Sequence, residues 1–282
     1  TPVVSSAASD VYKRQAGSSG GASTAVAARL LPFADGTDQM GSCRGPAAYA
    51  NIYGYRPTPG LISEDRSKGR KIPVLTTPGC LARTPDDMAF LLDEIVGSDI
   101  KDDYSFDLNQ SFKNQKIDEK DFINIKIGWL SDMNTYYKIE NKILDICEKQ
   151  LKKLEDLNIK IEKLKPDFDH DTLWSSWITF RSKSIYDDTL AMNIKDINTM
   201  TYQAIWEYNN GKNISDKDLQ IAKNQKNKCY KQIENIFKNF DFLALPSAQI
   251  FPFDKTLQFP KKINSFELDL SLIHISEPTR PA

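Results

Sequence analysis

The 282-residue sequence is poor in the residues that most often bind metals or transfer protons. It contains two histidines and four cysteines, and the cysteines are widely spaced with no Cys-x-x-Cys pair. Zinc sites and disulfide frameworks depend on clusters of these residues, so the sequence predicts neither. We therefore expect no metal, no cofactor and a reducing, cytoplasmic setting.

The sequence also lacks long hydrophobic runs and a large excess of charge of either sign. Crossing a bilayer requires about 20 consecutive apolar residues, and no run approaches that length. The formal net charge is −1 and the pI is about 6.2. Neither a membrane nor a nucleic acid is therefore expected as a partner. The mean hydropathy of −0.47 is ordinary for a globular protein.

The two ends of the chain differ in character from the rest. Residues 1–15 and 270–282 resemble translated sequencing adapters, and we exclude them from the fold prediction as non-native segments. The expected organisation is an adapter-like segment over residues 1–15, one partial domain over residues 16–269 that is truncated at both ends, and a second adapter-like segment over residues 270–282.

The most informative stretch holds two serine-bearing turns rich in glycine. Residues 17–21 read GSSGG, and an Ala-rich segment over residues 22–31 follows them. Glycines let backbone N–H groups converge, and a helix that starts behind them adds its positive N-terminal end. The second turn, over residues 35–42, reads DGTDQMGS. This pattern predicts two hydroxyl groups brought together beside backbone hydrogen-bond donors.

The two turns resemble the hallmark of the amidase signature hydrolases. The matching segments are AGSSGGASTAVAA and GTDQMGSCRGPAA, and similarity continues through residues 54–58 and 78–84. The resemblance implies that Ser42 is the nucleophile. It also implies that Ser18, 24 positions earlier, adjoins a cis peptide bond, lies within hydrogen-bond reach of Ser42 and relays its proton. The family's catalytic lysine lies upstream of the first turn, and we expect this chain to begin too late to contain it.

The resemblance also implies supporting roles around Ser42. The residues expected to line an oxyanion hole with their backbone N–H groups are Gln39, Met40, Gly41 and Ser42. The residues expected to support the loop are Ser19, Asp38 and Arg44, with Asp38 and Arg44 paired beneath it.

Two neighbours of Ser42 need separate interpretation. Met40 stands where the family usually has glycine, and a positive φ would cost methionine roughly 1 kcal/mol or more. We expect a negative φ there and a narrower pocket. Cys43 follows Ser42 directly and is expected to pack as an aliphatic residue would, rather than to react.

Other serine chemistries fit the sequence less well. A Ser-His-Asp triad lacks a histidine, because His274 lies in an adapter-like end and His170 occupies the polar run DFDHD, typical of the surface. A desolvated lysine can act as the base instead, because burial lowers its pKa. The first turn also fits a nucleophile elbow with Ser19 attacking, or a phosphate-binding loop. Neither explains the second turn.

Hydrophobic periodicity predicts the remaining elements. Strand–helix–strand units normally pair their strands in parallel. The expected elements are a short helix over residues 47–53, irregular chain over 61–80, a helix over 84–96, a strand over 123–129, a helix over 139–157, a strand from 159, aromatic-rich helices over 174–210, a helix capped by Ser215 and Asp218 that buries one stripe and ends near Phe240, and a buried strand over 242–247.

These patterns predict an α/β fold with a mixed β-sheet core flanked by helices. The expected function is hydrolysis of a carboxamide through an acyl-enzyme at Ser42, with a small-molecule amide as partner and a homodimer left open. Two alternatives stay open: the glutamine-hydrolysing amidotransferase subunit that serves tRNA-bound glutamate, and a catalytically silent truncated domain. Met40 and the segment over residues 252–254 favour a stand-alone amidase.

Overall fold

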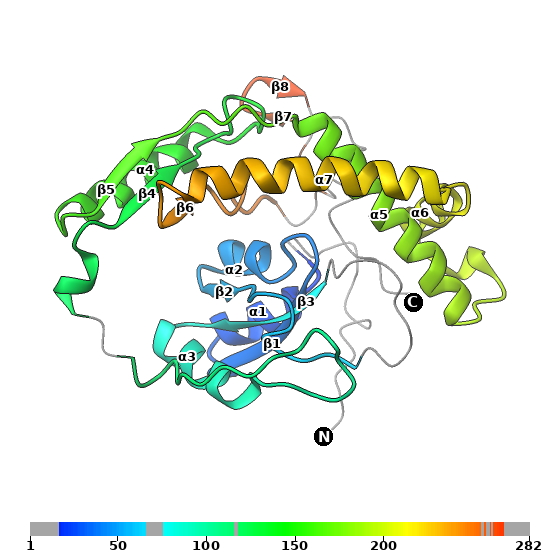
Figure 1. The fold of residues 1–282 in the computed structure, drawn as a ribbon, viewed down its shortest axis with the longest axis horizontal. Helices are drawn as coiled ribbons and strands as arrows, with labels where there is room; N and C mark the ends of the chain where they lie inside the picture. Colours follow the sequence, from blue (N-terminus) through cyan, green and yellow to red (C-terminus); the bar gives the residue numbers. More distant parts are fainter. Residues whose placement is uncertain are drawn as a thin grey trace.

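A computed structural model of the chain describes residues 17–65, 76–115, 118–254, 257, 260 and 262–267. The adapter-like segments predicted over residues 1–15 and 270–282 lie outside the described residues. Elements from about the first hundred residues gather in one group, called the N-terminal group below. The elements from residue 119 onward form an arc beside it, called the C-terminal group (Figure 1).

The N-terminal group is built on an antiparallel sheet with β3 in its centre. Leu81 and Ala82 of β3 are fully buried, so this strand forms the middle of a small core. The strands are β1 (Phe33–Asp38), β2 (Tyr53–Tyr55) and β3 (Thr77–Ala82), and the helices are α1 (Gly20–Ala27), α2 (Arg44–Ala50) and α3 (Pro85–Ile95).

Two boundaries in this group differ from the sequence prediction. Helix α2 begins at Arg44 and stops at Ala50, because Asn51 adopts a left-handed conformation with φ of 52° and ends the helix. Tyr53 consequently starts β2, whereas a helix was predicted there. Of the predicted irregular stretch over residues 61–80, the last four residues belong to β3.

Helix α3 confirms its predicted start and length. The Thr84 hydroxyl accepts a hydrogen bond of 3.1 Å from the Asp87 N–H, and Pro85 occupies the first helical position. Its buried residues Met88 and Leu92 pack with Ile62, Cys80 and Ala82. The helix therefore covers one side of the antiparallel sheet.

The C-terminal group contains a parallel sheet with the order β5-β4-β6. Its elements are the short helix η3 (Glu119–Phe122), β4 (Lys126–Trp129), α4 (Asn141–Glu155), β5 (Lys160–Lys163) and β6 (Phe242–Ala244). Parallel pairing of β4 with β5 confirms the predicted strand–helix–strand unit. The prediction that β6 is buried is wrong: β6 is an edge strand, and Phe242 is 55% exposed. Strand β4 also starts later than predicted, since Ile123 lies in the turn after η3.

Three helices complete this group: α5 (His170–Ala191), α6 (Tyr202–Lys212) and α7 (Asp216–Phe237), with the short helix η4 (Ile197–Thr199) before α6. Helix α5 contacts both α6 and α7. A Cβ at Gly211 would lie 2.1 Å from the Ser182 carbonyl oxygen, so glycine permits the close approach of α6 to α5. A small hairpin, β7 (Lys262–Ile263) and β8 (Phe266–Glu267), lies near the end of the described chain.

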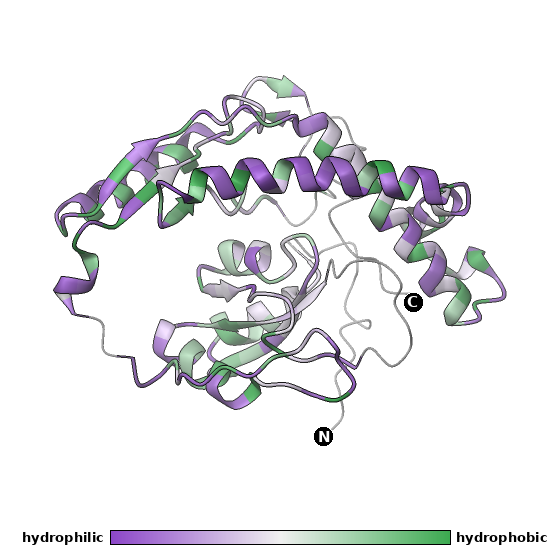
Figure 2. Cartoon of the chain, viewed as in Figure 1, coloured by the Kyte–Doolittle hydropathy of each residue, from purple (hydrophilic) through white to green (hydrophobic). Residues whose placement is uncertain are grey.

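Helix α7 confirms its predicted cap, and its predicted buried stripe in part. Ser215 and Asp218 form the predicted capping box. Ala222 is the buried residue of this helix, whereas Phe237, at its end, is 48% exposed. Figure 2 shows α7 as predominantly hydrophilic along its length. The other stripe positions, Leu219, Cys229, Ile233 and Ile236, are half-buried, so the stripe is only partly covered.

The mixed α/β fold class is confirmed. Within the described residues, the antiparallel and parallel pairings belong to separate small sheets. Every helix described is too short or too polar to span a lipid bilayer.

Candidate active site

The structure brings together the two serine-bearing turns, called here the Ser18 turn (residues 17–19) and the Ser42 turn (residues 39–43). The Ser19 N–H donates a hydrogen bond of 3.2 Å to the Ser42 carbonyl oxygen. The Ser19 hydroxyl lies 4.0 Å from the Cys43 sulfur. The peptide bond between Gly17 and Ser18 is cis, the conformation expected at this serine from the resemblance.

Gly36 of β1 lies directly beneath this junction. A Cβ there would sit 2.7 Å from Ser19 Oγ and 2.9 Å from Cys43 Sγ. Both distances are shorter than real Cβ contacts. The absence of a side chain at position 36 therefore lets the two turns meet.

Ser42 is buried, with 1% of its surface exposed, and its hydroxyl has no hydrogen-bond partner among the described residues. The predicted hydrogen bond between the hydroxyls of Ser18 and Ser42 is consequently not formed. The contact between the turns comes instead from the backbone of Ser19. A buried hydroxyl without a partner costs about 1–3 kcal/mol, and such groups in a folded protein call for an explanation.

Asp38, the last residue of β1, is fully buried and organises the Ser42 turn. Its carboxylate accepts hydrogen bonds from the backbone N–H groups of Gly41 at 2.8 Å, Cys43 at 3.2 Å and Arg44 at 3.4 Å. Burial alone would raise the pKa of Asp38. The hydrogen bonds from the Arg44 side chain and the backbone outweigh burial and hold that pKa below its usual value.

Two arginines neutralise Asp38. As the sequence predicts, Arg44 pairs with it, and the pairing is bidentate: Nε lies 3.0 Å from Oδ2 and Nη2 lies 2.9 Å from Oδ1. The hydrogen bond to Asp38 raises the pKa of Arg44. Arg56, which the sequence analysis gave no role, lies 3.5 Å from Oδ1 and also donates to the Asp38 carbonyl oxygen at 3.3 Å. Arg56 lies in the segment GYRPT, residues 54–58, which resembles the family signature, and this resemblance could have indicated a role for it.

The structure leaves fewer backbone N–H groups for the predicted oxyanion hole. Gly41 adopts a φ of +99°, which glycine tolerates, and donates its N–H to Asp38. That donor is therefore already used, because the buried Asp38 carboxylate requires it. In the described chain, the N–H groups of Gln39, Met40 and Ser42 form no hydrogen bond. Met40 does not adopt a positive φ, as expected.

Cys43 is fully buried beside Gly36 and Gly79. Burial, reinforced by the charge of Asp38, raises the pKa of its thiol to about 12. The thiol is therefore protonated at neutral pH, as a packing residue would be. Arg83, also in the family segment, donates to the carbonyl oxygens of Val26 at 2.8 Å and Leu31 at 2.7 Å and so holds the end of α1.

The side chain of Gln39 reaches a part of the chain that the sequence analysis did not connect with this site. Its Oε1 accepts a hydrogen bond of 2.6 Å from Arg181 of α5, which lies 142 positions away. Arg181 in turn pairs with Glu207 of α6 at 2.7 Å. No local pattern in the sequence signals this connection.

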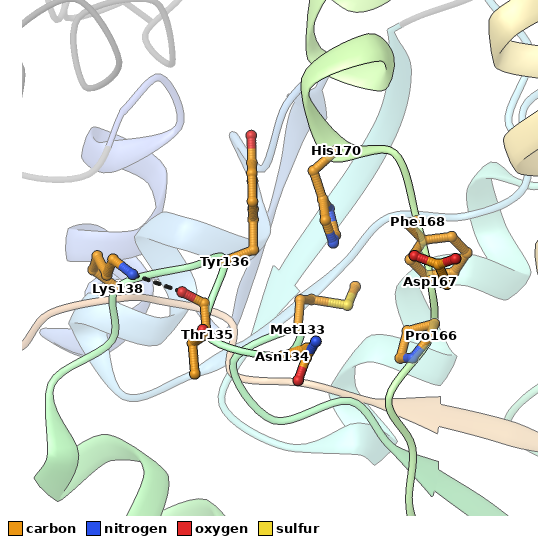
Figure 3. A pocket seen from close by; sticks show the side chains of 9 residues that line it. All are labelled: Met133, Asn134, Thr135, Tyr136, Lys138, Pro166, Asp167, Phe168 and His170. Atoms are coloured by element: carbon orange, nitrogen blue, oxygen red, sulfur yellow. Dashed lines mark hydrogen bonds between the residues drawn. The ribbon is translucent and has the colours of Figure 1, made fainter.

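His170 lies elsewhere, against a cavity of about 380 Å³ at the carboxyl ends of β4 and β5 (Figure 3). The lining residues are Met133, Asn134, Thr135, Tyr136, Lys138, Pro166, Asp167, Phe168 and His170. The ring of His170 stacks on that of Tyr136, with 4.1 Å between the ring centroids. Burial lowers the pKa of His170, although the charges of Asp171 and Asp169 act to raise it. The predicted surface histidine is therefore half-buried, and no residue of the Ser42 turn lines this cavity.

Comparisons with known proteins agree on one family. The family model described as Amidase matches residues 10–273. The A subunit of glutamyl-tRNA(Gln) amidotransferase from Pseudomonas putida is 36% identical over 166 residues, which are 55% of this chain and 32% of that protein.

Solved structures show the same fold. A bacterial aryl acylamidase of the amidase signature family superposes with a TM-score of 0.76 and 21% identity, covering 90% of this chain and 54% of that one. A 6-aminohexanoate cyclic dimer hydrolase gives a TM-score of 0.70 and 18% identity over 92% of this chain and 57% of that one. The chain thus spans little more than half the length of these enzymes and about a third of the Pseudomonas subunit.

Proposed function

Since the chain belongs to the amidase signature family, we propose that it hydrolyses the C–N bond of a carboxamide through an acyl-enzyme at Ser42. The observation that carries this proposal is the buried Ser42 hydroxyl, which lies close in the chain to the N–H groups of Gln39 and Met40; none of these groups has a hydrogen-bond partner among the described residues. A nucleophilic oxygen next to backbone donors is the arrangement that acyl transfer requires.

In the proposed reaction, Ser42 Oγ attacks the amide carbon while its proton passes to Ser18 and from there to the family's lysine base. The N–H groups of Gln39, Met40 and Ser42 stabilise the oxyanion, each contributing on the order of 3 kcal/mol when well aligned. The C–N bond then breaks, and the proton goes to the departing amine. Water attacks the Ser42 ester by the reverse proton path, releasing the acid and restoring the serine.

The hydrogen bonds that Asp38 accepts support this reaction by fixing the conformation of the Ser42 turn. Because Arg44 and the backbone satisfy the carboxylate, the turn holds its shape without using the N–H groups of Gln39 and Met40. Preorganised donors need no rearrangement when charge develops on the substrate oxygen. Ser19 completes the support by joining the two turns through its N–H. The proposed partner is a small-molecule amide in the cytoplasm.

A second candidate function is that of the amidotransferase A subunit, favoured by the 36% identity with the Pseudomonas protein. In that case glutamine would be the amide, and activity would need partner subunits and glutamyl-tRNA. Ammonia release from glutamine, measured with and without such partners, separates this candidate from the stand-alone amidase.

The test measures hydrolysis of a panel of aryl, alkyl and cyclic amides by two forms of the protein. We expect the 282-residue chain to show no Ser42-dependent hydrolysis, and a longer chain that adds the family lysine upstream to show it. In the longer chain, Ser42→Ala should lower kcat by roughly 10³-fold or more. Mass spectrometry should find the acyl group on Ser42. Equal hydrolysis by the Ser42→Ala variant, or a longer chain inactive on every amide, would refute the proposal. Full activity of the 282-residue chain would refute the assignment of the base to an upstream lysine.

A further inference from the structure

A buried ion pair of the C-terminal group reaches the Ser42 turn. Arg181 of α5 and Glu207 of α6 are 2% and 3% exposed. Arg181 Nε lies 2.7 Å from Glu207 Oε1, and Nη2 lies 3.2 Å from Oε2. This bidentate geometry neutralises the guanidinium charge within the protein. Helices α5 and α6, which carry Arg181 and Glu207, approach each other closely where Gly211 meets Ser182.

The third guanidinium nitrogen of Arg181 serves the Ser42 turn. Nη1 donates a hydrogen bond of 2.6 Å to Gln39 Oε1. Gln39 follows Asp38, whose carboxylate is already fixed by Arg44 and by backbone N–H groups. The start of the turn is therefore held at two consecutive residues, from β1 at Asp38 and from α5 at Gln39.

Two other roles for Arg181 explain the geometry less well. As a binding site for a substrate carboxylate it would need an uncompensated charge within reach of the substrate, yet Glu207 already pairs with the guanidinium through two hydrogen bonds and Arg181 is 2% exposed. The Trp177 ring, 5.8 Å from the guanidinium carbon, restrains it further. As a purely structural ion pair between α5 and α6, it would not require the hydrogen bond to Gln39.

We propose that Arg181 is a positioning residue for amide hydrolysis, which holds Gln39 so that the N–H groups of Gln39 and Met40 stay aligned as oxyanion donors. Arginine suits this task because its planar group donates in three directions at once, whereas lysine has a single ammonium centre. That Arg181 fixes the conformation of the Ser42 turn can be tested without any activity. That this conformation aids amide hydrolysis rests on the function proposed above.

The first experiment measures the turn without relying on activity. Hydrogen–deuterium exchange is followed for the amides of residues 39–45 in the full 282-residue chain. The variants are Arg181→Lys, which can still pair with Glu207, and Gln39→Leu, which leaves that ion pair intact. We expect both to speed exchange of these amides by about tenfold, the effect of losing one buried hydrogen bond to a charged donor.

The matched control is Ser176→Ala, also on α5. It removes a buried hydrogen bond of 2.6 Å between the Ser176 hydroxyl and Gln225 of α7, which does not involve the Ser42 turn. This variant should lower the melting temperature while leaving exchange at residues 39–45 unchanged. Unchanged exchange in Gln39→Leu, or equal acceleration in the control, would overturn the positioning role.

The second experiment measures kcat and KM in the longer, active chain. Arg181→Lys and Gln39→Leu should each lower kcat about tenfold and change KM less than twofold. The double variant should be no slower than the slower single one, since both changes remove the same contact. A rise in KM alone, or multiplicative losses, would contradict the proposal. Faster exchange in these variants, together with a longer chain that shows no Ser42-dependent hydrolysis, would refute the function proposed for Ser42 and keep the positioning role.

Discussion

The N-terminal and C-terminal groups bury their residues in different ways. In the N-terminal group, five of the six residues of β3 are buried, and Asp38, Ser42, Cys43 and Leu81 are 0 or 1% exposed. In the C-terminal group, no residue of α4 is buried, although all of that helix is described, and Ala222 is the buried residue of α7. The candidate catalytic residues therefore lie in the small, densely packed N-terminal group. The more loosely packed C-terminal group contacts them through Arg181, which donates a hydrogen bond to Gln39.

The largest effect is expected from removing the central charge of the N-terminal group. Asp38→Asn weakens the hydrogen bonds that the buried carboxylate accepts from backbone N–H groups and from Arg44, and a hydrogen bond to a charged group contributes about 1.5–3 kcal/mol. The contribution of Arg44 is discounted for screening, because its side chain is 49% exposed. Chemical denaturation should report this loss. Asp93→Asn is the matched control, because Asp93 accepts hydrogen bonds from Ser111 and Phe112 and pairs with no arginine among the described residues. A loss in Asp93→Asn equal to that in Asp38→Asn would contradict the central role of Asp38.

The next effect comes from glycine at the junction of the two turns. Gly36→Ala places a methyl group against Ser19 and Cys43, and overpacking of this kind costs about 1–3 kcal/mol. Gly45→Ala, in α2, meets no atom within 4 Å. That control should be neutral or stabilise by about 0.4–1 kcal/mol through the unfolded chain. Thermal unfolding of both variants checks the pair, and equal melting temperatures would show that Gly36 does not hold the turns together.

A smaller effect is expected on acidification. The pKa of Asp38 is lower in the folded than in the unfolded protein, so its stabilising contribution is complete above the unfolded value of about 3.9. The contribution is lost as the pH falls from there through the lower folded pKa. Denaturation between pH 6 and pH 2.5 should show a steeper loss of stability than in Asp38→Asn, which keeps other carboxylates of lowered pKa such as Asp93. An identical slope in the variant would assign the acid sensitivity to other carboxylates.

The smallest expected effect is a difference in cysteine labelling rate between the two groups, which involves no change in stability. Cys43 and Cys80 are fully buried, and burial raises the pKa of each thiol to about 12. Cys147 and Cys229 are half-buried in the C-terminal group. A thiol-reactive dye should label Cys147 and Cys229 first, as read by peptide mass spectrometry. Early labelling of Cys43 would show that the N-terminal group opens more readily than its packing indicates.

The sequence predicted the features of this protein that depend on short-range chemistry. The two turns could be identified because glycine favours tight turns and because their residues resemble the signature of a known family. The hydroxyl of Thr84 marks a helix start by local hydrogen bonding. The pairing of Asp38 with Arg44 is likewise contained within one loop. The site residues themselves stay predictions until Ser42 is tested.

Features set by distant contacts could not be predicted in this way. The Gly41 N–H is taken by Asp38 because tertiary packing buries that carboxylate completely. The contact between Gln39 and Arg181 joins residues 142 positions apart. The exposure of Phe242 depends on which strand lies at the edge of the parallel sheet, and periodicity carries no information about sheet order.

The link from Ser19 to Ser42 is made by main-chain atoms, which has a consequence for how this region tolerates change. Any amino acid at position 19 other than proline keeps the N–H that makes the link, and the carbonyl at position 42 is present whatever the side chain. Replacing either serine by alanine therefore removes a hydroxyl while the scaffold beneath it persists. Loss of function in Ser42→Ala can therefore be read as lost chemistry rather than as misfolding, whereas Ser19→Ala should keep its function.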